Sequence, residues 1–182
     1  RADDLAIAAL TELVRVDGYR RSQSDAGLAW AEVAAGVLER TGGDERQRAA
    51  LEHGIGVVLQ SAGRYDEARQ KLKSALALRR RVLGDRHPAV AETQTQLGFV
   101  LRDQGRFAEA RVALEAALQL REGLYGASHP TIATTLNQLG GAYRRLGDFD
   151  RSLQAHQRAL AIAEASLGND HIEAGYAHNH LG

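Results

Sequence analysis

Apolar residues recur along this chain at the three- and four-residue intervals of amphipathic helices, and the whole pattern returns every 42 residues. Each unit shows a helix with an aliphatic–glycine pair in its middle, a glycine that ends this helix, and a second helix that begins at an aromatic residue. We therefore expect antiparallel helix pairs joined by short turns, with about seven complete helices and the start of another. The terminating glycines are Gly63, Gly105 and Gly147, and the aromatic residues are Tyr65, Phe107 and Phe149.

The mid-helix glycines are costly, because glycine inside a helix is roughly 1 kcal/mol less favourable than alanine. They return in phase at Gly56, Gly98, Gly140 and Gly182. This regular return predicts a close approach between helices that no side chain at these positions would allow.

The linkers between helix pairs also repeat, and they place a histidine at positions 87, 129 and 171. Histidine is a common metal ligand, but the 42-residue interval puts each one in a different repeat, too far apart to share one ion. We expect each histidine to cap or pack against the helix that follows. The basic run Arg79–Arg81 is explained by the helix dipole, which favours cations at a helix C-terminus, and we expect it to be solvated.

The first part of the chain follows the pattern only loosely. We expect one helix there, then a turn over residues 18–24, then a second helix that ends at Gly42. The predicted apolar faces are Ile7, Leu10, Leu13 and Val14 on the first helix, and Trp30, Val33, Val37 and Leu38 on the second.

A fixed period of this length is typical of a solenoid, in which one helix pair stacks on the next. We divide the chain into a degenerate helix pair at 1–43, repeats at 44–85, 86–127 and 128–169, and the start of a truncated repeat at 170–182. All are expected to form one continuous solenoid, with residues 171–182 its least stable part. The chain contains no methionine, even at its start, so we expect it to be a piece of a longer protein.

The composition of the chain argues against several classes of function. Lys and Arg together number 23, as do Asp and Glu, and this balance argues against a nucleic-acid-binding domain or a polybasic membrane anchor. No run approaches 18 apolar residues, so no membrane-spanning helix is predicted. The absence of cysteine excludes disulfides and thiolate metal sites and is compatible with a cytoplasmic location, which we predict.

Catalytic and cofactor motifs do not emerge from the sequence. Gly54-Ile55-Gly56 lies in mid-helix and lacks the third glycine of a nucleotide-binding loop, and no Gly-Lys-Ser/Thr phosphate loop is present. Ser, His and Asp are all available, but nothing places them in a nucleophile elbow. We expect no enzyme activity in this chain and no cofactor or metal.

The repeat resembles the tetratricopeptide repeat (TPR). The family pattern is Leu-Gly, a bulky residue three positions on, and then Gly-x-aromatic-x-x-Ala. It is matched here by Leu97-Gly98, Leu101 and Gly105 to Ala110, and again by Leu139-Gly140, Tyr143 and Gly147 to Phe149. The 42-residue length and the Leu-Gly-x-x-His-Pro linker resemble the kinesin-light-chain subclass, which is also found in bacterial signalling proteins. The resemblance implies an all-α, right-handed superhelical solenoid of antiparallel helix pairs.

Three residues depart from the pattern of the other repeats, and two of them lie in the repeat at 128–169. His156 stands where they have Leu72 and Leu114, Ser152 replaces an alanine, and Ile172 replaces the linker proline. We expect this repeat to pack less tightly than its neighbours.

The resemblance implies a concave groove lined mainly by the first helix of each pair. Asn and Gln amides can pair with the backbone of an extended peptide, and Arg pairs bidentately with carboxylates. The groove is therefore expected to bind a protein or peptide segment, with an acidic or C-terminal peptide as the best fit; the other interpretation is that these are solvated polar residues on an exposed helix face. The predicted groove residues are His53, Gln60, Thr95, Gln96, Phe99, Arg102, Asn137, Gln138, Arg144 and Asn179.

The predicted function is thus a protein–protein interaction scaffold, acting as a recognition or regulatory region of a larger bacterial signalling protein. The resemblance suggests a serine/threonine kinase domain elsewhere in such a protein. The alternative is a structural self-association module without a peptide ligand.

Overall fold

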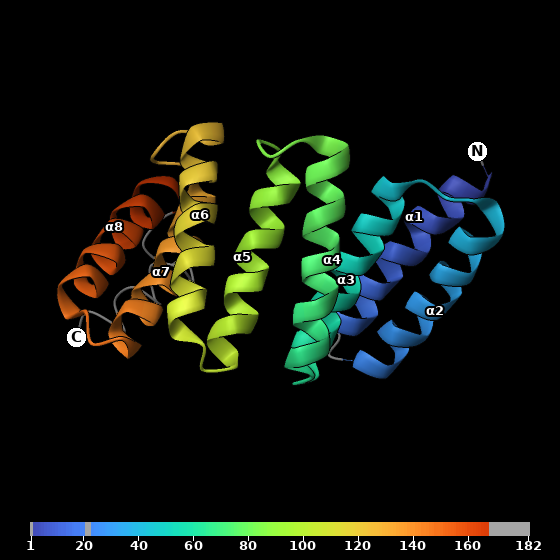
Figure 1. Ribbon diagram of the computed structural model, residues 1–182. Coiled ribbons are helices and arrows are strands. Elements are labelled where there is room, and N and C mark those ends of the chain that lie inside the picture. Colours follow the sequence, from blue (N-terminus) through green and yellow to red (C-terminus); the bar gives the residue numbers. More distant parts are fainter. Residues whose placement is uncertain (1, 21–22, 168–182) are drawn as a thin grey trace. The chain divides into compact units, whose positions relative to one another are not determined.

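The computed structural model describes residues 2–20 and 23–167, and these contain eight α-helices and one π-helical turn. The helices are α1 (Ala2–Arg15), α2 (Ser24–Thr41), α3 (Glu45–Ser61), α4 (Tyr65–Leu83), α5 (Pro88–Asp103), α6 (Phe107–Tyr125), α7 (Pro130–Arg145) and α8 (Phe149–Leu167), and the π turn is η1 (Val16–Arg20) (Figure 1). The prediction of about seven complete helices was one too few. The chain divides into two compact units, residues 1–85 and 86–182.

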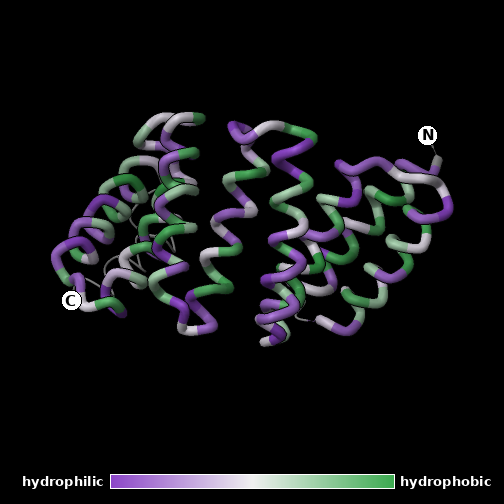
Figure 2. The backbone as a smooth tube through the Cα atoms, viewed as in Figure 1, coloured by the Kyte–Doolittle hydropathy of each residue, from purple (hydrophilic) through white to green (hydrophobic). Residues whose placement is uncertain are grey.

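Polar and apolar residues are interspersed along every helix, so that each helix has one face suited to burial (Figure 2). In the first unit α1 packs on α2 and α3, and α3 packs on α4. In the second unit α5 packs on α6, α6 on α7, and α7 on α8. Within the described residues, no helix combines the length and the apolar character needed to cross a membrane.

The core of the first unit differs in part from the predicted apolar faces. Ile7 and Val14 are buried as expected, but Leu13 is exposed, and on α2 Trp30 and Val33 are exposed as well. Small residues take their place: α2 turns Gly27, Ala31 and Ala34 inward.

Close backbone packing explains why small residues occupy the buried face of α2. A Cβ on Gly27 would lie 2.5 Å from the Cα of Gly18 in η1. The segment predicted as a turn from residue 18 begins as part of this π turn, with Gly18 itself buried. Large side chains on this face of α2 would force the two segments apart.

The predicted close approaches at the mid-helix glycines are confirmed at three positions. A Cβ on Gly56 would come within 2.6 Å of Leu72, one on Gly98 within 2.5 Å of Leu114, and one on Gly140 within 2.6 Å of the His156 ring. In each pair the second helix inserts a side chain against the bare backbone of the first helix. Gly182 lies outside the described residues.

Two linker histidines cap the helices that follow them, as predicted. The Ala89 amide donates to Nδ1 of His87 (3.1 Å), and the Thr131 amide donates to Nδ1 of His129 (3.3 Å). Both histidines precede a proline at the first helical turn, where a missing N–H costs nothing. His171, Ile172 and the predicted truncated repeat lie outside the described residues.

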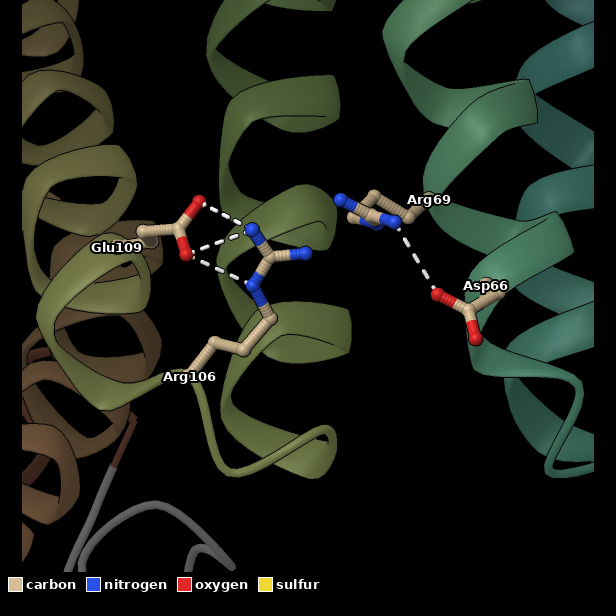
Figure 3. Close-up of polar contacts among 4 residues, drawn as sticks. All are labelled: Asp66, Arg69, Arg106 and Glu109. Carbon is tan, nitrogen blue, oxygen red and sulfur yellow. Dashed lines mark hydrogen bonds and ion pairs between the residues drawn. The ribbon is translucent and has the colours of Figure 1, made fainter.

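The second helices begin with charged pairs that reverse sign between repeats. Arg64 and Arg106, the residues before α4 and α6, each make two 2.7 Å bonds to the glutamate three positions on, Glu67 and Glu109 respectively. Figure 3 shows the pair of Arg106 and Glu109 beside a further pair within α4, in which Arg69 lies 3.1 Å from Asp66. Before α8 the order is inverted, since Asp148 accepts from the Arg151 amide at 3.1 Å and pairs with its guanidinium. These pairs are exposed, so each contributes at most about 1 kcal/mol to stability.

The basic run at the end of α4 is only partly solvated. Arg80 pairs with Asp85 at 3.3 Å, and Arg81 forms an ion pair with Glu45. Arg79, however, is only 8% exposed, so the prediction of a fully solvated run was wrong at this position. The helix repeat turns Arg79 toward the buried face that also carries Ala68, Leu72 and Ala75.

Candidate functional site: a groove between α5 and α7

The second unit has a cavity of about 420 Å³ between the ends of α5 and α7. We call it the α5–α7 groove. Its lining combines cationic, amide, aromatic and glycine residues: Arg102, Asp103, Gly105, Phe107, Asn137, Gln138, Gly141, Arg144 and Arg145.

Four of the residues predicted from the sequence lie around this one cavity: Arg102, Asn137, Gln138 and Arg144. They come from two successive first helices, because the 42-residue period places Arg102 and Arg144 at the same position of consecutive repeats. The structure thus brings them together, while their contact with a ligand remains a prediction.

The other predicted residues do not line the cavity. Thr95 is 4% exposed and its hydroxyl donates to the Ala91 carbonyl of its own helix (2.8 Å). Gln96 and Phe99 are partly buried on α5, and His53 and Gln60 are partly buried on α3 in the first unit. Asn179 lies outside the described residues.

Arg102 is held in place from three directions. Its Nε and Nη2 donate to Oδ1 of Asp103 (3.0 and 2.6 Å), and its Nη1 donates to Oε1 of Gln138 across the groove. Its guanidinium carbon also lies 5.9 Å from the centre of the Phe99 ring, within range of a cation–π contact. Arg102 therefore joins the two helices as part of the wall.

The other two arginines of the groove, Arg144 and Arg145, do not join the two helices in this way. Arg145 lies over the Phe107 ring at 5.7 Å. Arg144 is exposed, and in the part of the chain that the structure describes no carboxylate pairs with it. The groove thus carries three arginines against one aspartate, which already pairs with Arg102. Such a surplus of positive charge attracts an anionic group, and an unpaired guanidinium can bind a carboxylate bidentately.

Gly141 gives the groove its depth. A Cβ built on Gly141 would meet no atom within 4 Å, and the position one repeat earlier holds Phe99. This repeat therefore leaves open space at a position where the preceding repeat carries an aromatic side chain.

Sequence reasoning missed Asp103, Phe107 and Arg145 as lining residues. Phe107 was identified only as the start of a second helix, although an aromatic residue just after the turn faces the end of the next first helix. The Arg144-Arg145 dipeptide was an available signal, since adjacent arginines at a helix end cannot both follow one face. The described lining has no Ser, Thr, His or Cys side chain.

Comparisons with known proteins agree with this architecture. The tetratricopeptide repeat family model matches residues 47–123, 90–165 and 131–182. No curated protein sequence matches the chain.

Three solved structures share the fold. BtubC (BKLC) from P. vanneervenii has a TM-score of 0.81 at 22% identity over 91% of this chain, which spans 66% of BtubC. A Podosopora anserina protein described as a putative kinesin light chain with nearly identical TPR-like repeats has a TM-score of 0.79 at 21% identity, covering 96% of this chain and 83% of that one. The apo form of RapI has a TM-score of 0.76 at 16% identity, and the match covers 88% of this chain and 57% of RapI.

The matched segments span most of the chain, and their 42-residue helix pairs have the form of kinesin-light-chain-type repeats. TPR repeats are protein–protein interaction scaffolds and are in general not catalytic. This chain belongs to the tetratricopeptide repeat family, as an all-α solenoid of antiparallel helix pairs.

Proposed function

We propose that this scaffold binds an extended peptide in the α5–α7 groove, with an acidic side chain or a C-terminal carboxylate of the peptide on Arg144. The observation that supports this most directly is the exposed Arg144 beside the amides of Asn137 and Gln138. A carboxylate satisfies the guanidinium, and amide groups can bond to the peptide backbone. The predicted lack of nucleic-acid binding and the cytoplasmic location stay predictions.

The experiment is fluorescence anisotropy with labelled extended peptide libraries, one with free acidic C-termini and one amidated and neutral. Three variants identify the site. Arg144→Glu reverses the charge, Gly141→Phe fills the hollow with the side chain that Phe99 provides one repeat earlier, and Gly141→Ala serves as the matched control.

We expect the acidic library to bind and the neutral one to bind at least tenfold more weakly, since charged hydrogen bonds are the strong ones. Both Arg144→Glu and Gly141→Phe should abolish binding, while Gly141→Ala retains it. Binding that survives both changes would place the ligand on another face.

The alternative function is self-association, and one observation favours it. Phe149 and Leu153 lie one turn apart on α8 with 69% and 46% of their surfaces exposed. Apolar residues that adjoin in this way are typical of contact surfaces. Under this alternative, sedimentation would show a mass that rises with concentration, and Phe149→Asp would return it to that of the monomer without affecting peptide binding.

The wider context is also a proposal. By resemblance to repeats of this subclass, we infer that the scaffold is a recognition or regulatory region within a larger bacterial signalling protein, one with a serine/threonine kinase domain elsewhere. Copurification of the full-length protein with kinase activity toward a generic substrate would test this.

A further inference from the structure

Polar residues replace apolar ones in two repeats, and the two cases differ in how the polar groups are satisfied. In the last described helix pair, His156 stands where the other repeats have leucine, and it is only 1% exposed. Its Nδ1 lies 3.2 Å from Oδ1 of Asn137. Ser152, which replaces an alanine, donates to the Gly140 carbonyl at 2.9 Å. These replacements are bonded within the helix pair, so their burial gives no sign of the looser packing that we predicted.

In the repeat at 44–85 the polar replacements are exposed instead. They are Arg48, Ser74 and Arg81, at the positions that hold Val90, Ala116 and Gly123 one repeat later. Position 90 is a core position, since Val90 is only 1% exposed. The repeat at 44–85 thus has two cations and a hydroxyl where the next repeat has no polar side chain.

These three residues line one cavity in the first unit. The cavity has a volume of about 430 Å³, lies between the start of α3 and the last turns of α4, and is called the α3–α4 pocket below. Its lining includes Glu45, Arg48, Ser74, Ala77, Leu78 and Arg81. In the repeat at 128–169, the equivalents of Arg48 and Leu78 are Ile132 and Ile162, which belong to one buried apolar cluster. The earlier repeat leaves open space here, and its volume is within the range of small-ligand sites.

The pocket carries an excess of positive charge. Arg81 donates through Nε to Oε2 of Glu45 (2.8 Å) and through Nη2 to Oε1, which leaves its Nη1 without a partner among the described residues. Within the same part of the chain, no carboxylate pairs with Arg48 and no group bonds to the Ser74 hydroxyl. Two guanidinium groups and one carboxylate line the pocket, so its field attracts an anion.

Arg48 is a costly residue at its position by two local criteria. It lies in the first turn of α3, where the helix dipole favours anions and disfavours cations. An apolar residue would also bury its surface there, as Val90 does in the next repeat. A bound anion offsets the first cost, and departures from local rules of this kind are expected at functional positions.

We propose that the α3–α4 pocket binds the phosphate group of a phosphate monoester. The donors exceed what a carboxylate with two oxygens can accept, because the fork of Arg48 is joined by the Ser74 hydroxyl and Nη1 of Arg81. A phosphate monoester has three strong acceptor oxygens, and arginine binds it bidentately. Ala77 and Leu78 offer apolar contacts to the carbon that carries the phosphate. The ester can be a small molecule or a phosphorylated side chain, since both share this chemistry.

The test is a titration of the whole protein at constant ionic strength, followed by the NMR signals of backbone amides and arginine Nε–H groups. Glycerol phosphate represents the small-molecule source, a short phosphoserine peptide represents the protein source, and acetate represents a carboxylate. We expect the phosphate esters to shift the signals of Arg48, Ser74 and Arg81, and acetate to bind about tenfold more weakly. The ester that binds more tightly identifies the source of the phosphate.

Two variants and a matched control locate the site. Arg48→Val installs the residue of the next repeat; it should unfold at the same or a higher urea concentration than the wild type but bind phosphate about tenfold more weakly. Ser74→Ala should weaken binding about fivefold. Arg46→Gln is the control, because it removes a positive charge from the same turn of α3 at a residue outside the pocket, and it should change the affinity less than about twofold.

Glu45→Gln should act in the opposite direction, because it removes the carboxylate that competes for Arg81, and we expect binding to tighten about threefold. If Arg48→Val binds like the wild type, or Arg46→Gln weakens binding equally, the pocket holds an adventitious ion only and the proposal is overturned. Acetate that binds as tightly as the esters would also overturn it. The inference does not rest on the proposed function, since Arg144→Glu in the second unit should leave phosphate binding unchanged.

Discussion

Two adjacent glycines of α7 should respond to alanine in opposite directions. Gly141 faces the open groove, where a methyl group meets no atom within 4 Å. Gly141→Ala should therefore stabilise the protein by about 1 kcal/mol, which is the helix-propensity difference between the two residues. Its neighbour Gly140 gains the same propensity, but there the methyl group would have to share space with the His156 ring.

The size of that conflict can be worked from the distances. A Cβ on Gly140 would lie 2.6 Å from Nε2 and 2.8 Å from both Cδ2 and Cε1 of His156. Three atoms of a rigid ring are too close at once, and overpacking of this kind costs about 1–3 kcal/mol. After the gain in propensity of about 1 kcal/mol, we expect a net loss of about 1 kcal/mol. The two variants should thus differ by about 2 kcal/mol.

Urea unfolding followed by circular dichroism at 222 nm measures this difference directly. In thermal melts it corresponds to about 4–8 °C for a chain of this length. Gly98→Ala is a second case with the same expected sign, because its Cβ would lie 2.5 Å from Cγ of Leu114. In a His156→Ala background the penalty at Gly140 should vanish, since the obstructing ring is absent. Gly140→Ala that stabilises as much as Gly141→Ala would refute this account of the packing.

Three further outcomes follow from the described contacts. Asp44→Ala should lower the free energy of unfolding measured with urea by about 1 kcal/mol. The Asp44 carboxylate accepts a hydrogen bond from the Gln47 amide at 2.8 Å, in a capping box at the start of α3. Asp44→Asn should lower that free energy much less. Burial, followed by the hydrogen bond to Glu115, raises the pKa of Tyr143 to about 12. An unfolded tyrosine ionises near pH 10, so the stability that Tyr143 contributes is complete below about pH 10 and is lost between about pH 10 and 12. Between pH 9 and 11.5, the free energy of unfolding should therefore fall more steeply in the wild type than in Tyr143→Phe. Gly27→Ala should cost about 3 kcal/mol, more than Gly140→Ala, because its Cβ would strike backbone at 2.5 Å, and a nearly normal melting temperature would contradict that packing.

Repetition explains why so much of the fold could be predicted from the sequence. Positions that return every 42 residues give several independent views of one local environment, so the spacing of Gly56, Gly98 and Gly140 was by itself enough to predict a close helix approach. The same logic placed Arg102 and Arg144 on successive first helices, and both line the cavity.

The prediction failed where a single copy of a pattern had to be interpreted. In α2 the large residues Trp30 and Val33 were assigned to the core, but the backbone contact at Gly27 requires small residues there and leaves them exposed. The depth of the groove could not be predicted either, since the empty space beside Gly141 depends on what neighbouring helices leave unfilled. Hydrophobic periodicity identifies a face of a helix, but it does not report the distance to the next helix.

The reversed charge order and the polar core of the last helix pair also bear on how a repetitive chain finds its correct pairing. Near-identical helices can dock on the wrong partner during folding, and similar neighbours are prone to exchange. If α8 docked on α5 instead of α7, His156 would be buried against Gly98 with Thr95 in place of the Asn137 amide, and mismatched buried polar groups disfavour such an arrangement. The pair of His156 and Asn137 therefore favours the docking of α8 on α7 over its docking on α5. A variant with leucine and alanine at positions 156 and 152 should fold to a more stable state but populate more misdocked species in rapid refolding.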